Sequence, residues 1–454
     1  MSDGQDAVAR LDALLTPLGH ELLDRLKRED VTPETTLRVA TLLRAEYPAD
    51  LVRDALAQHE LRDRARSKFT RAADMFFTRA GLEQGSSEPV ASYRAGRYHG
   101  AERVADLCCG IGGDLVALAA SHQLLAVDRD PLHARMARAN AGVYGVAGHV
   151  TVATADVRDA DLTGVPGVFV DPARRTGQRR LRAGDSEPPL GWCLALAGRI
   201  PAVGIKAAPG LPHELAPPGW ELEFIATGRE LKEAVLWSPP LATVTRRATI
   251  LPGPHTLTRA PGGAGLPGGA GPDTEVPVLP PGRFLYDPSP AVTRAGLVQD
   301  LALLINAWKI DDQIAFLSSD APAQTPFARL LEVIDSAPWD QKRLPARLRA
   351  LDVGAADIRR RGLAGDVDRL HRQLKLSGSR RVTLVMTRVS NHPWALVCQE
   401  PRDLLSCAAP VRIRTNLDTK CTQCKIGEMI MKFRWAASLG GGEFRWAASF
   451  GGVG

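Results

Sequence analysis

The chain has few of the features that mark secreted or membrane proteins. It contains seven cysteines, an odd and scattered set that indicates reduced thiols rather than a disulfide framework. It has no stretch of about 18 uncharged apolar residues, so no membrane span is expected. Its polar N-terminus lacks the apolar run that a signal peptide needs. We therefore expect a cytoplasmic protein without membrane contact.

A complete set of metal ligands is also missing. Cys421 and Cys424 have the spacing of half a zinc site, but no second cysteine pair follows them and no histidine lies beyond His392. No metal site is therefore expected.

Neither sign of charge dominates. The 57 Lys and Arg residues against 51 Asp and Glu give a net charge of +6, which permits an anionic partner without requiring one. With 44% hydrophobic and 24% charged residues the composition is that of a globular chain, and 454 residues suffice for two or three domains.

Composition and periodicity divide the chain into five segments. Apolar residues at helical spacing predict a helical region over residues 1–98. Over 99–251, short apolar runs alternate with helical stretches, as in a doubly wound, Rossmann-like α/β sheet. Residues 252–282 are dense in Pro and Gly and read as a linker. Residues 283–400 mix helix and strand and predict a smaller α+β domain, whereas residues 401–454 are predicted to be a disordered tail.

The 99–251 segment contains short apolar runs that we predict as strands. They are Val104–Ala105, Leu124–Val127, Val150–Val152, Val168–Val170, Ala202–Ile205, Leu222–Ala226, Ala234–Trp237 and Ala248–Leu251. Beyond the linker, we predict a helix over Ala291–Trp308 and a strand over Val382–Thr387.

The first of these strands runs into a glycine-rich turn that reads Val-Ala-Asp-Leu-Cys-Cys-Gly-Ile-Gly-Gly-Asp. The strand ends in Asp106, and Gly110, Gly112 and Gly113 precede a predicted helix. Glycines let the backbone approach a ligand closely, and the helix start offers N–H groups to an anion. A dinucleotide fingerprint would need a glycine where the chain has Leu115. The turn therefore favours S-adenosylmethionine (SAM), whose methionine carboxylate would be the anion.

Acidic residues follow the next three strands. Asp128 closes the second strand, where a carboxylate can accept hydrogen bonds from both ribose hydroxyls. Asp156 follows the third strand, where an acid can accept from the adenine amine, and Asp171 closes the fourth. Ligands bind at the carboxyl ends of strands in open α/β sheets. Together with Asp106 these acids make four in register, which favours a cofactor site over chance helix caps.

The glycine-rich turn, the trailing acids and the sequence Asp171-Pro-Ala-Arg-Arg together resemble class I SAM-dependent methyltransferases. They resemble more closely the bacterial group that carries a THUMP-like C-terminal domain. Further segments that match this group are Gly81–Ser87, Glu230–Trp237, Phe284–Pro288, Thr325–Arg329 and Ile358–Gly362. The resemblance covers roughly residues 10 to 400 and implies methyl transfer, SAM as the cofactor and RNA as a substrate class.

This resemblance implies roles for individual residues. The cofactor would contact Asp106, Gly110, Gly112, Gly113, Asp128 and Asp156. Asp171 would face the transferred methyl group, with Arg174 and Lys206 near the acceptor. One departure is Lys206-Ala-Ala-Pro-Gly210, where relatives often have Lys-x-Ser-Pro-Gly.

The acceptor atom stays open. Enzymes that methylate an exocyclic amine of a flipped base usually place an aromatic residue where this chain has Arg174, so an adenine amine is disfavoured. Methylation of a pyrimidine carbon needs a cysteine nucleophile. Cys108, Cys109 and Cys193 read more simply as packing residues.

Two basic clusters suit an RNA backbone. The first is Arg174, Arg175, Arg179, Arg180 and Arg182, and the second is Lys342, Arg343, Arg347, Arg349 and Arg359–Arg361, with Arg380 and Arg381. Few aromatics are interleaved, so base stacking would contribute little. The same clusters would also suit a solvated surface. A small-molecule methyltransferase and an RNA-binding protein with a vestigial cofactor site are the alternatives.

Overall fold

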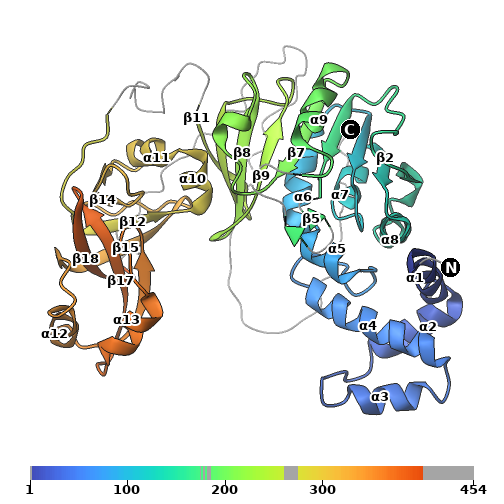
Figure 1. Ribbon diagram of the computed structural model, residues 1–454, viewed down its shortest axis with the longest axis horizontal. Helices are drawn as coiled ribbons and strands as arrows, with labels where there is room; N and C mark the ends of the chain where they lie inside the picture. Colours follow the sequence, from blue (N-terminus) through green and yellow to red (C-terminus); the bar gives the residue numbers. More distant parts are fainter. Residues whose placement is uncertain (1–2, 174, 177–178, 181–185, 260–274, 402–454) are drawn as a thin grey trace, which may run out of the picture. The chain divides into compact units, whose positions relative to one another are not determined.

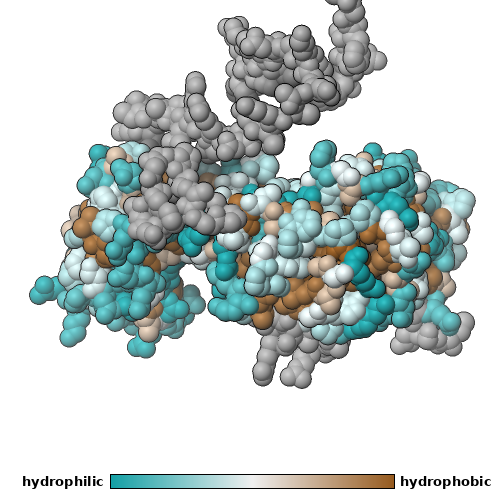
Figure 2. All heavy atoms as spheres, turned by 90° about the horizontal axis from the view of Figure 1, so that it is seen from above, coloured by the Kyte–Doolittle hydropathy of each residue, from teal (hydrophilic) through white to brown (hydrophobic). Residues whose placement is uncertain are grey.

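The computed structural model describes residues 3–173, 175–176, 179–180, 186–259 and 275–401. Arg174, Arg182, Cys421, Cys424 and nearly all of the predicted tail lie outside these residues. Among the described residues, no helix combines the length and apolarity that crossing a membrane requires. In Figure 2, hydrophilic side chains are spread over the coloured surface, with apolar areas between them.

A nine-stranded sheet forms the centre of the 99–251 segment (Figure 1). Its strands are β1 (Arg103–Leu107), β2 (Gln123–Asp128), β3 (Val150–Thr154), β4 (Gly167–Val170), β7 (Ala202–Ala207), β8 (Glu221–Thr227), β9 (Glu230–Trp237), β10 (Arg246–Leu251) and β11 (His255–Arg259). They lie in the order β11-β10-β8-β9-β7-β4-β1-β2-β3. Only β9 and β11 run antiparallel to their neighbours. Every strand predicted over 99–251 is present, so the doubly wound sheet is confirmed.

The sheet is buried on both faces, as its continuous apolar strands require. Along β4, Val168 packs into one apolar core and Phe169 into another. The connecting helices include α7 (Leu115–Ala119), α8 (Pro131–Val143) and α9 (Leu190–Ala195). The strand order reverses between β1 and β4, which is where such sheets bind ligands.

The last strand of the sheet lies inside the segment that composition reads as a linker. β11 pairs with β10 over five residues, from Arg259 opposite Arg246 to His255 opposite Ile250. Residues 260–274, the most glycine-rich part of this segment, lie outside the described residues.

Helices form the N-terminal region. They are α1 (Asp3–Leu14), α2 (Pro17–Leu26), α3 (Thr36–Leu43), α4 (Ala49–Ala65), α5 (Arg79–Gln84), α6 (Glu88–Ala95) and the short 3-10 helix η1 (Gly96–Tyr98). Side-chain caps begin two of them: Thr16 accepts from the Gly19 backbone N–H at α2, and Thr78 accepts from the Gly81 N–H at α5. The core of this region includes Ile111 of the glycine-rich turn and Met136 of α8. The N-terminal helices therefore pack directly against the predicted cofactor loop.

A second sheet follows the linker in the order β13-β14-β12-β15-β18-β17-β16. Its strands are β12 (Phe284–Pro288), β13 (Trp308–Lys309), β14 (Leu317–Ser319), β15 (Ala328–Pro338), β16 (Val353–Arg360), β17 (Arg380–Val389) and β18 (His392–Gln399). Its helices are α10 (Pro290–Ala295), α11 (Val298–Leu304), α12 (Leu344–Ala350) and α13 (Val367–Leu374). The predicted strand Val382–Thr387 lies within β17, and the smaller α+β domain is confirmed.

The continuous helix predicted over Ala291–Trp308 is wrong. Gly296 has φ +72° and ends α10 in the left-handed conformation, so α11 starts as a separate helix. Trp308 already belongs to β13.

Candidate cofactor and active site

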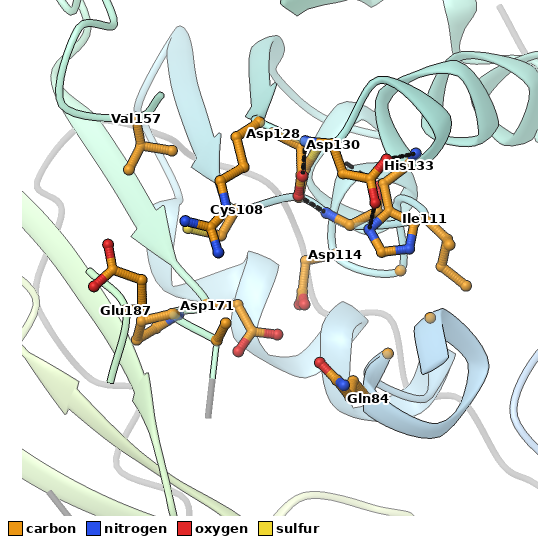
Figure 3. A pocket seen from close by; sticks show the side chains of 18 of the residues that line it. Gln84, Cys108, Ile111, Asp114, Asp128, Asp130, His133, Val157, Asp171 and Glu187 are labelled. Carbon is orange, nitrogen blue, oxygen red and sulfur yellow. Dashed lines mark hydrogen bonds and ion pairs between the residues drawn. The ribbon is translucent and has the colours of Figure 1, made fainter. Parts of the chain in front are cut away.

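A cavity of about 240 Å³ opens at the carboxyl ends of β1, β2, β3 and β4. The loops after these four strands line it, and α5 of the N-terminal region adds Gly81 and Gln84. In Figure 3, Asp128, Asp130 and His133 group at one end of the cavity, and Asp171 and Glu187 lie at the other. The cavity therefore lies at the reversal of strand order, as the spacing of the acids predicts.

The glycine-rich turn is held in a left-handed conformation. Cys108, Gly110 and Gly112 have φ values of +64°, +54° and +89°. A β-carbon on Gly112 would lie 3.2 Å from Cα of Ala137, so this glycine lets the turn pack against α8. A β-carbon on Gly110 would meet nothing within 4 Å. Gly110 thus leaves room for a ligand beside the backbone.

Asp128 fixes this turn and lines the cavity. Its Oδ2 accepts from the Gly110 backbone N–H at 2.8 Å, and its Oδ1 accepts from the Asp130 N–H at 2.9 Å. Asp130 in turn caps α8 by accepting from the Leu132 N–H. Each carboxylate oxygen of Asp128 keeps a further lone pair for a ligand hydroxyl.

Asp156 sits in a small ion-pair chain at the cavity rim. It accepts from the Arg158 backbone N–H at 2.9 Å, and that N–H lowers the pKa of the Asp156 carboxyl. The Arg158 guanidinium contacts Asp156 at 3.0 Å and Glu187 at 2.5 Å. Glu187 also pairs with Ala173 through its backbone. Arg158 therefore links the loop after β3 to the segment that follows Asp171.

Asp171 is paired with a buried ammonium. Lys206 of β7 donates to Oδ2 of Asp171 at 2.6 Å and to Oγ of Ser86 at 3.1 Å. The Ser86 hydroxyl accepts a second bond from Arg94 at 2.6 Å and donates to Oδ2 of Asp114 at 2.9 Å. One serine from the N-terminal region therefore joins the Asp171–Lys206 pair to the start of α7.

Arg94 is the centre of this buried network. It also pairs with Asp114 and Glu233, and its guanidinium lies 4.7 Å from the ring centroid of Phe169. Burial alone would lower the pKa of Arg94, but the two carboxylates outweigh it and raise that pKa. Burial raises the pKa of Glu233, and Arg94 opposes the rise.

Asp106 differs from the other acids. It is completely buried in β1, and it is not among the residues that line the cavity. Neither of its carboxylate oxygens has a hydrogen-bond partner within the described part of the chain.

The cysteines next to the turn are not activated nucleophiles. Cys108 and Cys109 line the cavity, and burial raises the pKa of both thiols. Cys193 is buried in the core, where burial raises its pKa to about 12. All three are free thiols.

The structure places the predicted site residues in three groups. Gly110, Gly113, Asp128, Asp156 and Asp171 line the cavity. Asp106, Gly112 and Lys206 are not among the lining residues, and Lys206 contacts the lining residues Asp171 and Ser86. Arg174 lies outside the described residues.

Sequence reasoning missed several residues of this region. They are Gln84, Ser86, Arg94, Asp114, His133, Asn140, Arg158, Glu187 and Glu233. Gln84 and Ser86 lie in the segment Gly81–Ser87, Glu233 lies in Glu230–Trp237, and Asp114 ends the glycine-rich turn, all of which the family resemblance marks. Nothing in these segments predicts the three hydrogen bonds of Ser86.

The strand order and the position of the cavity define a doubly wound protein that binds its ligand at the carboxyl edge of the sheet, and comparison with known proteins specifies the class. The chain is 38% identical over 338 residues to an uncharacterized SAM-dependent methyltransferase found in two strains of Mycobacterium tuberculosis. The match covers 72% of this chain and 89% of the relative. The chain therefore belongs to the SAM-dependent methyltransferases, and it is an enzyme with SAM as its cofactor.

Family models match three parts of the chain. The model for RNA cap guanine-N2 methyltransferases matches residues 101–244, and a THUMP domain-like model matches residues 328–400. A domain of unknown function, DUF8688, matches residues 6–65. A crystal structure of a methyltransferase from Porphyromonas gingivalis W83 has a TM-score of 0.65 at 20% identity. It covers 89% of this chain and 100% of that one, which shows that the fold is shared.

The residues at the cavity fit this cofactor. Gly110 leaves open space at the turn, and the Asp128 carboxylate lines the cavity with lone pairs to spare. When bound, SAM supplies an electrophilic methyl group on a sulfonium, and the chain supplies its position and its electrostatic surroundings.

Proposed function

We propose that this methyltransferase acts on RNA. The observation that carries the proposal is the presence, in one chain, of a match to RNA cap guanine-N2 methyltransferases and a match to THUMP-like domains. The cavity adds a positioned carboxylate, Asp171, but its residues leave the acceptor atom open. The alternative of a small-molecule substrate is an outcome of the experiment below.

Within this proposal, the residues divide the work as follows. Asp128 accepts from the ribose hydroxyls, the Gly110–Gly113 turn receives the methionine end, and Asp156 lies at the adenine. Asp171 faces the acceptor, and Lys206 holds its carboxylate in place through the 2.6 Å contact. Asp106 acts from behind the turn rather than by contact. We also propose that the predicted division into five segments reflects the domain organisation, except that β11 extends the first sheet to Arg259. We propose further that the enzyme works in the cytoplasm.

The second basic cluster offers a surface for RNA, but not through all of its members. Arg347 pairs with Asp335, and Arg361 pairs with Asp287 at 2.9 Å and lies over the ring of Phe316. These two arginines therefore belong to the fold rather than to a binding surface.

Other cations of the same domain are exposed. Lys342, Arg349 and Arg359 have no ion pair within the described residues, and the same holds for Arg369 and Arg372 of α13. Helices α12 and α13 both pack against β16, so these side chains belong to adjoining elements. Exposed guanidinium and ammonium groups can neutralise phosphates without sequence preference.

Transfer of tritium from labelled SAM tests this function. The purified chain is incubated with total RNA, with a small-molecule extract and with protein, each as a separate acceptor. We expect label in RNA that becomes acid-soluble after ribonuclease treatment, and loss of that label in Asp171→Asn. Label that enters only the small-molecule extract would overturn the RNA proposal while leaving the SAM site intact.

A further inference from the structure

Carboxylates outnumber cations around the glycine-rich turn. Within the described residues, the group of Asp106, Asp114, Asp128, Asp171 and Glu233 is contacted by two cationic side chains, Arg94 and Lys206. A buried group of like charges cannot stay fully ionised, because the low dielectric strengthens their repulsion. This crowding favours a proton on one of these acids when the cofactor is absent.

The geometry singles out Asp106. Asp114 accepts from Ser86 and Arg94, and Asp171 accepts from Lys206. Asp128 accepts from two backbone N–H groups, and Glu233 accepts from Arg94. Asp106 is fully buried, and both of its oxygens lack a donor within the described residues. Nothing stabilises its ionised form by hydrogen bonding.

Several charged side chains from neighbouring elements act on the pKa of Asp106. Burial raises the pKa of Asp106 well above its usual range, Asp114 and Asp171 raise it further, and Asp128 adds to the rise. Arg94 of α6 opposes them. Asp114, Asp128 and Asp171 line the cofactor cavity. A positive charge placed in the cavity therefore offsets the negative potential that these carboxylates create at Asp106.

SAM and its product, S-adenosylhomocysteine, differ in the charge on their sulfur atom. SAM carries a sulfonium, whereas S-adenosylhomocysteine carries a neutral thioether, and their amino-acid ends are the same. We propose that Asp106 holds a proton in the free enzyme and releases it to solvent when SAM binds, so that the site prefers the cationic cofactor to its neutral product. This inference depends on the SAM site and not on the nature of the acceptor.

The sign of the pH dependence follows from linkage. If the free enzyme binds one more proton than the SAM complex, SAM affinity rises with pH, by up to about tenfold per pH unit while Asp106 is protonated only in the free state. The affinity for S-adenosylhomocysteine shows a smaller rise. The α-amine titrates in both ligands, so the difference between them isolates the sulfonium.

Calorimetry of the full chain measures this directly. SAM and S-adenosylhomocysteine are titrated in buffers of different ionisation enthalpy at the same pH, and the slope gives the protons exchanged. We expect SAM to release roughly one proton more than S-adenosylhomocysteine. Equal proton release by the two ligands would overturn the proposal without any variant.

Two variants assign the proton to a residue. Asp106→Asn replaces a neutral acid by a neutral amide of the same shape, so we expect an unchanged or higher thermal midpoint at pH 7 and no extra proton release with SAM. Asp161→Asn, an exposed acid between β3 and β4 that does not line the cavity, is the control, because Asn can still accept from the Thr163 N–H. It should keep the extra release. Extra release that persists in Asp106→Asn would assign the proton to another acid and refute the proposal.

Discussion

At the scale of single residues, Asp128 combines two tasks, and Asp128→Ala removes both of them. The substitution removes the proposed ribose acceptor and also the partner of the Gly110 and Asp130 N–H groups. We expect SAM binding to weaken by about 1.5–3 kcal/mol in calorimetry, since hydroxyls and N–H groups lose a charged acceptor. Asp128→Asn keeps one acceptor oxygen and should lose less. Wild-type affinity in Asp128→Ala would place the ribose elsewhere.

Ser86 allows a similarly sharp test. Its hydroxyl accepts hydrogen bonds from Arg94 and Lys206 and donates one to Asp114, and all three side chains are buried. Ser86→Ala should lower the free energy of unfolding by about 2–3 kcal/mol, because three buried charged groups each lose one hydrogen-bond partner. Denaturant unfolding measures this.

The next residue provides the control for Ser86. Ser87 precedes α6 but its side chain makes no capping hydrogen bond. Ser87→Ala should therefore leave the unfolding midpoint unchanged. Equal effects of the two substitutions would show that the Ser86 hydroxyl is not the centre of the network.

The residue scale also shows what the sequence could predict. The positions of Asp128, Asp156 and Asp171 at the strand ends could be predicted, because each of these acids follows an apolar run that the sequence marks as a strand. Ser86 was not, because Lys206, the partner that gives it a role, lies 120 residues along the chain. Asp106 shows a third case: its place at the end of β1 was predicted, but its complete burial was not.

At the scale of elements, Asn140 ties helix α8 to both the N-terminal region and the cofactor turn. Its side-chain amide donates to the carbonyl oxygens of Ile111 at 2.8 Å and Phe76 at 3.0 Å, and its oxygen accepts from the Phe76 N–H at 2.8 Å. Asn140→Ala strands three buried backbone groups. We expect a loss of about 2–4 kcal/mol in stability, and weaker SAM binding because the turn loses its support.

Arg135 on the same helix is the comparison. It forms a half-exposed pair with Asp12 at 2.7 Å. Such surface pairs contribute little, so Arg135→Ala should leave denaturant unfolding and SAM affinity unchanged. A stability loss in Asn140→Ala no larger than that in Arg135→Ala would contradict the role of Asn140.

The same scale explains which elements the sequence predicted correctly. The strands of the first sheet follow from continuous apolar runs. The Glu221-Leu-Glu-Phe alternation suggests that β8 has one solvated face, yet Glu221 and Glu223 are completely buried. Arg97 and Arg247, from other elements, provide their counter-charges, which no local pattern reveals.

At the scale of the whole molecule, the proposed RNA function predicts a salt-dependent binding surface in the C-terminal domain. Between residues 340 and 381, twelve Lys and Arg residues face five Asp. Replacement of Arg349, Arg359 and Arg372 by alanine removes exposed cations without touching the ion pairs of Arg347 and Arg361. RNA affinity should fall across sequences, because each neutralised phosphate releases counterions.

The slope of RNA affinity against salt concentration decides this prediction. The triple variant should flatten the slope by roughly two to three units, and its SAM affinity in calorimetry should equal that of the wild type. Arg28, Arg38 and Arg44 are exposed on the N-terminal helices or beside them, so their replacement by alanine removes the same charge from a different region. That control should keep the wild-type dependence of RNA affinity on salt, because only cations that contact the RNA phosphates release counterions on binding. Equal slopes in the two triple variants would show that RNA is attracted by net charge alone, and the THUMP-like domain would lose its assigned role.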